Sequence, residues 1–146
     1  IATACHLGAM LAGADPATQQ QMRQFGRSLG LAFQVVDDWL GIWGDPGVTG
    51  KDASMDLISR KKTIPILFGL EQHQEFARQW QAGFTADQVA SLADLLKEEG
   101  AQAYTEAEAE RLTKQALAAV ETALGKDNEY GQMLAALAMK LTTRSA

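Results

Sequence analysis

The chain has 146 residues, of which 47% are hydrophobic, a formal net charge of −5 and a single cysteine. This length and hydrophobic content suffice for a folded core and exclude a disordered polypeptide. The negative charge argues against general nucleic-acid affinity, no apolar run is long enough to span a bilayer, and Cys5 alone cannot form an internal disulfide. Helix-forming residues are frequent and only 3 residues are proline, so we expect an all-α fold.

The first half of the chain predicts two helices and a loop. Residues 1–13 are small and apolar and predict a tightly packed helix. Residues 19–42 predict a long helix, in which Gly26 and Gly30 permit the close approach of a neighbour. Residues 44–50 are rich in glycine and predict a loop.

The second half predicts further helices in one continuous domain. Thr85 and Gln88 have the spacing of a capping box, Gly125 ends a helical run, and Asn128 begins the last one. The helices are expected over residues 63–80, 85–99, 103–124 and 128–141.

The helix over residues 19–42 carries a polar face. Gln34, Asp37, Asp38 and Gly41 fall at i, i+3, i+4 and i+7 and therefore share one side. Two adjacent carboxylates are costly to bury unless they meet a cation or hydrogen-bond donors. Because Mg²⁺ often takes one or two protein carboxylates and completes its shell with water and phosphate, Asp37 and Asp38 are candidate metal ligands.

Basic side chains follow at short distance along the chain. Lys51 lies one loop after the aspartate pair and could contact phosphate as a point charge, as could Lys61 and Lys62. Lys61 and Lys62 stand at a helix start and have two interpretations, as surface charges or as phosphate ligands. Positive charge there opposes the helix dipole, and this conflict is a reason to consider phosphate. Gln34 can offer its carbonyl dipole to a developing cation, and Phe33 can line the same space.

Other polar and aromatic residues of this region have simpler interpretations. Asp45 and Asp56 are expected to order the loop or cap a helix rather than to bind metal. His73 is expected to be structural because no second histidine or cysteine stands nearby at ligand spacing. Trp39 and Trp43, four residues apart, predict packing.

The segment over residues 30–65 resembles the second aspartate-rich region of the trans-isoprenyl diphosphate synthases, and residues 5–14 resemble the small-residue helix of that family. One departure is Gly41, where the fuller DDxxD pattern has a third aspartate. The matching elements are FQ at Phe33 and Gln34, DD at Asp37 and Asp38, GD at Gly44 and Asp45, GK at Gly50 and Lys51, DL at Asp56 and Leu57, and KT.P at Lys62, Thr63 and Pro65.

The resemblance implies an isoprenoid-synthase-type helical bundle of which only the C-terminal portion is present. Residues 1–146 are then the C-terminal part of a single all-helical prenyltransferase domain. Its N-terminal part, with the first aspartate-rich motif, is absent, so the isolated piece is expected to be inactive. The implied partners are a second copy in a cytoplasmic homodimer and the missing N-terminal half of its own chain.

The implied activity is Mg²⁺-dependent condensation of an allylic diphosphate with isopentenyl diphosphate, giving a longer polyprenyl diphosphate and pyrophosphate. Asp37 and Asp38 would hold the metal, Lys51, with Lys61 or Lys62, would bind diphosphate, and Gln34 would face the carbocation. We further expect the loop over residues 44–51 to close over the diphosphate. Two alternatives are a terpene cyclase on the same scaffold and a non-catalytic partner subunit of a prenyltransferase, the latter favoured by Gly41.

Overall fold

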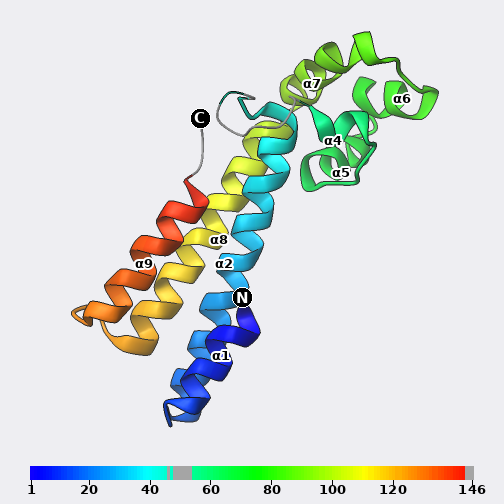
Figure 1. The fold of residues 1–146 in the computed structure, drawn as a ribbon. Coiled ribbons are helices and arrows are strands. Elements are labelled where there is room, and N and C mark those ends of the chain that lie inside the picture. The colour runs from blue at the N-terminus through cyan, green and yellow to red at the C-terminus, as the bar shows by residue number, and fades with distance from the viewer. Residues whose placement is uncertain (46, 48–53, 144–146) are drawn as a thin grey trace. The chain divides into compact units, whose positions relative to one another are not determined.

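A computed structural model describes residues 1–45, 47 and 54–143, and within these residues all regular structure is helical. The all-α prediction is therefore confirmed. None of the helices in this part of the chain combines the length and apolar character needed to cross a membrane. The elements shown in Figure 1 are α1 (Ala2–Leu11), α2 (Pro16–Trp43), α4 (Met55–Ile58), α5 (Ile64–Glu71), α6 (Glu75–Ala82), a 3₁₀ turn (Ala86–Gln88), α7 (Val89–Glu98), α8 (Ala101–Leu124) and α9 (Glu129–Thr142).

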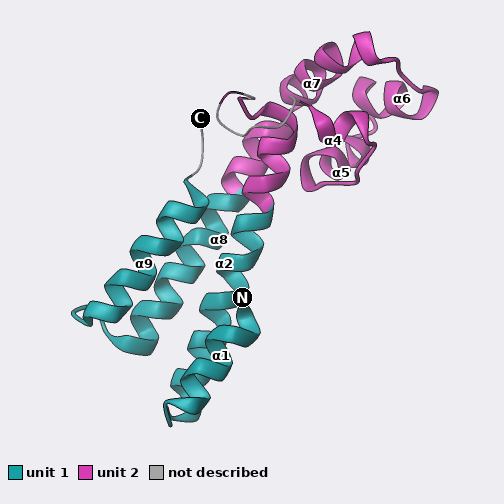
Figure 2. Ribbon diagram, in the orientation of Figure 1, with its two compact units in different colours: residues 1–34, 108–144 teal, residues 35–107, 145–146 magenta. Residues whose placement is uncertain are grey.

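The helices form two compact units, coloured separately in Figure 2. Unit 1 comprises Ile1–Gln34 and Glu108–Arg144, and unit 2 contains Val35–Ala107. Both divisions fall inside long helices, so α2 and α8 each contribute residues to both units.

Unit 1 packs α1, the first part of α2, the later part of α8 and α9 around an apolar core. Phe25 and Leu29 of α2 meet Val120 of α8 there. Gly26 allows α1 to lie close, because a Cβ atom at this position would stand 2.8 Å from the Cα of Ala2. The close approach predicted at Gly26 is confirmed.

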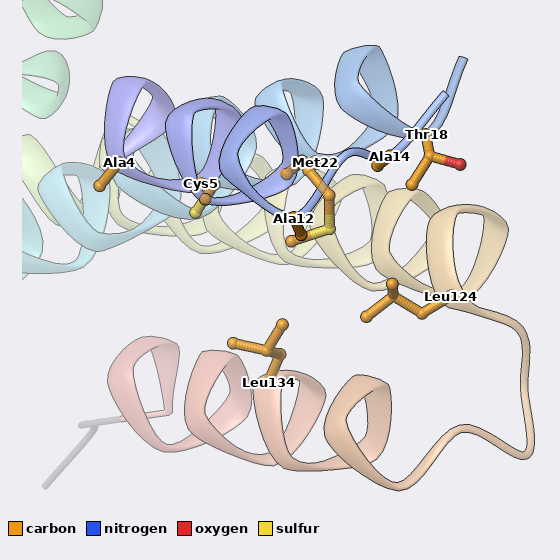
Figure 3. Close-up of a pocket in the computed structure, with 10 residues that line it drawn as sticks. Ala4, Cys5, Ala12, Ala14, Thr18, Met22, Leu124 and Leu134 are labelled. Atoms are coloured by element: carbon orange, nitrogen blue, oxygen red, sulfur yellow. The ribbon is translucent and has the colours of Figure 1, made fainter. Parts of the chain in front are cut away.

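An apolar pocket of about 430 Å³ opens in unit 1 beside α1. Figure 3 shows Cys5 of α1, Ala12 just after it, Met22 of α2, Leu124 of α8 and Leu134 of α9 around it. The small residues of the first helix, recognised in the sequence as a close-packing surface, thus line a hollow that the sequence did not predict.

The helix α2 begins earlier than predicted. Asp15 caps it, because the Oδ1 atom of Asp15 accepts hydrogen bonds from the backbone N–H groups of Ala17 and Thr18 at 2.9 and 3.1 Å. Pro16 occupies the first helical position, where its fixed φ and missing N–H are tolerated. The start therefore lies at Pro16 instead of residue 19.

Unit 2 has its own core, formed where α4, α5, α6 and α7 meet the end of α2. Its fully buried side chains include Leu57, Ile66, Phe76 and Leu92. Trp43 packs at the edge of this core, and its indole N–H donates to the carbonyl of Ala93 at 3.3 Å. The packing role predicted for this tryptophan is confirmed.

The single helix predicted over residues 63–80 is wrong. The chain forms α5 and α6 instead, separated by His73 in a left-handed conformation with φ 54°. A Cβ atom at Gly69 would lie 2.7 Å from the ring of Phe76, whereas residues seven apart in one straight helix are separated by about 10 Å along its axis. The chain reverses at His73 because this brings Phe76 back against α5.

Local signals further along the chain are confirmed. The capping box at Thr85 is present, with the backbone N–H of Thr85 donating to Oε1 of Gln88 at 2.9 Å. Asn128 caps α9 by accepting a hydrogen bond from the backbone N–H of Gly131 at 2.9 Å. Both interactions depend on residues three positions apart, which explains why the sequence shows them.

Candidate functional site

The carboxylate of Asp38 meets the beginning of α5 inside unit 2. Its side chain is only 7% exposed, its Oδ2 atom accepts a hydrogen bond from the backbone N–H of Ile64 at 3.3 Å, and its Oδ1 atom lies 3.4 Å from Nζ of Lys61. Thr63, the residue before α5, provides no side-chain cap. Asp38 therefore supplies the negative charge that a helix N-terminus favours.

Lys61 bridges Asp38 to a second carboxylate. Its Nζ atom lies 3.5 Å from Oδ2 of Asp56, which stands in the first turn of α4. Burial by itself lowers the pKa of Lys61, but attraction to Asp56 and then to Asp38 outweighs it, so the pKa is raised. The lysine is thus held in its charged form between two acidic groups.

The carboxyl group of Asp56 lies in a partly buried, acidic environment. Burial raises the pKa of its carboxyl group, Lys61 opposes that shift, and the charges of Asp38 and Asp37 add to the rise. Asp37 itself is half-buried in α2. Lys61 therefore stands between two carboxylates, and the charge of Asp37 acts on one of them, Asp56. This concentration of negative charge attracts a further cation.

Gly41 faces the same carboxylate. A Cβ atom at Gly41 would stand 2.6 Å from Cγ and 3.1 Å from Oδ1 of Asp56. The carboxylate of Asp56 thus occupies the space in which a side chain at position 41 would begin. Asp56 was expected only to order the loop or cap a helix, and no spacing rule could pair it with Gly41, fifteen positions away.

The remaining predicted residues stand as follows. Lys62 is exposed. Phe33 is half-buried and Gln34 exposed, and both belong to unit 1, whereas the contacts described above all lie within unit 2. Lys51 lies outside the described residues, as does most of the predicted closing loop.

Two other expectations for this region are confirmed by contacts. Asp45 orders the chain after α2, since its Oδ1 atom accepts a hydrogen bond from the backbone N–H of Gly47 at 2.8 Å. Trp39 and Trp43 lie with their ring centroids 6.1 Å apart, as a packed pair. The indole N–H of Trp39 also donates to Glu106 at 3.1 Å, which fixes α8 to α2 inside unit 2.

The acidic cluster is chemically suited to a hard divalent ion. Its acidic members offer carboxylate oxygens, the ligands that hard divalent ions prefer. Over the described part of the chain, no three metal-binding side chains converge on one point. Asp37 and Asp38 fit a partial Mg²⁺ site, with water and phosphate as the other ligands.

Comparisons with known proteins identify a family. The model of the family "Polyprenyl synthetase" matches residues 1–98. A geranylgeranyl diphosphate synthase of Mycobacterium tuberculosis is 47% identical over 91 residues, which are 62% of this chain and 26% of that protein. The crystal structure of a polyprenyl synthetase from Streptomyces coelicolor has a TM-score of 0.84 and 35% identity, covering 97% of this chain and 45% of that one.

A second solved structure carries ligands. A geranylgeranyl pyrophosphate synthase from Corynebacterium glutamicum, complexed with isoprenyl diphosphate and magnesium, has a TM-score of 0.79 and 32% identity, covering 94% of this chain and 41% of that one. This chain therefore spans less than half the length of these three proteins. The predicted isoprenoid-synthase fold is confirmed, and with the family model matching more than half of its residues, the chain belongs to the polyprenyl synthetase family.

Proposed function

We propose that this chain is the C-terminal part of a single-domain, Mg²⁺-dependent trans-prenyltransferase, which condenses an allylic diphosphate with isopentenyl diphosphate. The observation that supports the proposal best is the ion pair of Asp38 with Lys61, next to Asp37 on α2, because carboxylates suited to a metal ion and a cation suited to phosphate then lie close together. It lies within the matched family region. A similar protein solved with isoprenyl diphosphate and magnesium supports the same ligands.

The reaction begins with cleavage of the bond between carbon and oxygen in the allylic diphosphate. Bound Mg²⁺ would neutralise the charge that develops on the leaving pyrophosphate. Asp37 and Asp38 would hold this ion, while the backbone N–H of Ile64 fixes the orientation of the Asp38 carboxylate. Lys61 would contact the diphosphate oxygens as a compact point charge.

Other residues of the motif would act on the organic part of the substrate. Gln34 would turn its carbonyl dipole toward the allylic cation, and Phe33 would line the space around it. The double bond of isopentenyl diphosphate attacks the cation, and loss of a proton from the resulting carbocation forms the new double bond. The products are a longer allylic diphosphate and pyrophosphate. Lys51 and Lys62 are further candidates for diphosphate binding.

Product identification tests this proposal. The full-length protein containing this chain is incubated with Mg²⁺, isopentenyl diphosphate and a series of allylic diphosphates, and the products are identified by chromatography and mass spectrometry. Longer linear diphosphates support the proposal. Cyclic hydrocarbons indicate a terpene cyclase, and product that forms only when a second prenyltransferase subunit is added indicates a partner subunit. The homodimer and the cytoplasmic location also remain proposals.

A further inference from the structure

Arg60 holds the turn between α4 and α5 against the aromatic core of unit 2. The Cζ atom of its guanidinium lies 5.0 Å from the ring centroid of Trp80 and 5.0 Å from that of Phe84. Its Nη2 atom also donates a hydrogen bond to the backbone carbonyl of Trp80. A cation over two aromatic faces with a directed hydrogen bond is fixed in position and orientation.

The aromatic anchor is part of the packed core of unit 2. Trp80 is buried, with its ring centroid 5.7 Å from that of Phe76 and 5.6 Å from that of Phe84. Phe76 is fully buried in the core of unit 2. Arg60 is therefore tied to the best-packed part of the unit rather than to a surface side chain.

The backbone at Arg60 needs such support. Its φ of 54° lies in the left-handed region, which a long side chain adopts only when its surroundings fix it. The residues that follow point their polar groups at Asp38, through Nζ of Lys61 at 3.4 Å and the N–H of Ile64 at 3.3 Å. A change of backbone conformation at residue 60 would redirect both groups.

We propose that Arg60 is a positioning residue, whose guanidinium, placed against the rings of Trp80 and Phe84, sets the turn that presents Lys61 and the Ile64 N–H to Asp38. The consequence for diphosphate binding rests on the function proposed above. The effect of Arg60 passes through Lys61 and, by way of the Ile64 N–H, through Asp38. An arginine suits this task better than a lysine because its planar group stacks on rings while donating in a fixed direction.

The test combines two readouts on the full-length protein. The variant Arg60→Asn removes the guanidinium that contacts Trp80 and Phe84, but keeps a residue that tolerates left-handed backbone. Hydrogen exchange of the backbone amide of Ile64 reports the turn directly. Calorimetric titration with inorganic pyrophosphate and Mg²⁺ reports the anion site. Both are repeated in a Lys61→Ala background, and Arg78→Asn, which removes an equal charge from α6, serves as the control.

We expect Arg60→Asn to speed exchange at Ile64 and to weaken pyrophosphate binding about tenfold, the scale of one misplaced charged contact. In the Lys61→Ala background it should weaken binding by a smaller factor, because only the route through the Ile64 N–H and Asp38 remains. Arg60→Lys should weaken binding less than Arg60→Asn does. Phe84→Leu, which removes one ring and keeps the apolar bulk, should reproduce a smaller effect. Arg78→Asn should change neither readout.

Three results overturn the inference. The first is unchanged hydrogen exchange at Ile64 in Arg60→Asn. The second is a loss of pyrophosphate affinity on Arg60→Asn that is equally large with and without Lys61. The third is no loss of affinity in Arg60→Asn although Lys61→Ala does weaken binding. If Lys61→Ala leaves pyrophosphate affinity intact, the phosphate role proposed for Lys61 fails. In that case Ile64 exchange alone decides whether Arg60 positions the turn.

Discussion

Replacing Gly41 by alanine should destabilise the protein, although the same change usually stabilises a helix. Alanine within a helix is favoured over glycine by about 0.5–1 kcal/mol. At position 41, however, the added Cβ atom would meet the carboxylate of Asp56, with 2.6 Å to Cγ. Asp56 has a short side chain, stands in the first turn of α4 and is paired with Lys61. Its carboxylate can therefore move away from the added Cβ atom only if the ion pair breaks or α4 shifts.

The size of the effect follows from these opposing terms. Forcing one extra carbon into a packed site costs about 1–3 kcal/mol. Subtracting the helical gain leaves a net loss of about 0–2.5 kcal/mol in the free energy of unfolding. Gly8 in α1 is the matched control, because a Cβ atom there would meet nothing within 4 Å. Gly8→Ala should therefore show only the gain in stability that alanine brings to a helix.

Thermal unfolding of the full-length variants measures this difference. The midpoint should fall in Gly41→Ala and stay level or rise in Gly8→Ala. In an Asp56→Ala background the alanine at position 41 should no longer be harmful, because the opposing carboxylate is gone. If Gly41→Ala stabilises the protein as much as Gly8→Ala does, Asp56 does not occupy the space beside Gly41, and the described geometry of the site is wrong.

Four further predictions concern the acidic cluster and the helix packing. Asp37→Ala should lower turnover about a hundredfold or more with little change in the unfolding midpoint, because metal ligands contribute several kcal/mol to charge neutralisation. Near-normal turnover at saturating Mg²⁺ would contradict this prediction. Asp38→Ala should in addition cost about 1 kcal/mol of stability, measured by denaturant unfolding, because it removes the acceptor at the start of α5. The raised pKa of Asp56 favours its protonated form in the folded state. The stability of the wild type relative to Asp56→Asn should therefore grow as the pH falls through that raised pKa, and it should level off below the ordinary value of 3.8. A difference in stability that does not change with pH would refute the shift. Gly26→Ala should lower the unfolding midpoint, because its Cβ atom would meet the backbone of Ala2, and an unchanged midpoint would refute that contact.

The sequence predicts those parts of the fold that depend on neighbouring residues. The cap at Asn128 and the capping box at Thr85 are formed within one helical turn, and the glycine at position 26 reveals close packing whatever the partner. The reversal at His73 could not be predicted in this way. Apolar residues keep a helical spacing across it, and only the packing of Phe76 against α5 requires the break.

The candidate site shows the same limit. The motif treats Asp37 and Asp38 alike, yet Asp38 is buried at the start of α5 while Asp37 is half-buried. The partner of Asp38, the N–H group of Ile64, comes from a position twenty-six residues later, which the motif does not reveal. Likewise, the contact of Asp56 with Gly41 requires α4, a helix of 4 residues that is too short to leave a periodic signal.

The central claim is that the carboxylates of α2 bind a metal-bridged diphosphate. Calorimetric titration of inorganic pyrophosphate into the full-length protein, with Mg²⁺ and with a chelator, tests it most directly. The variants compared are the wild type and Asp37→Asn, which removes the charge and keeps the shape of the side chain. We expect binding that requires Mg²⁺ and is weakened at least tenfold in Asp37→Asn, as the loss of one charged ligand implies. Pyrophosphate affinity that is equal in both proteins, or independent of Mg²⁺, would contradict the account.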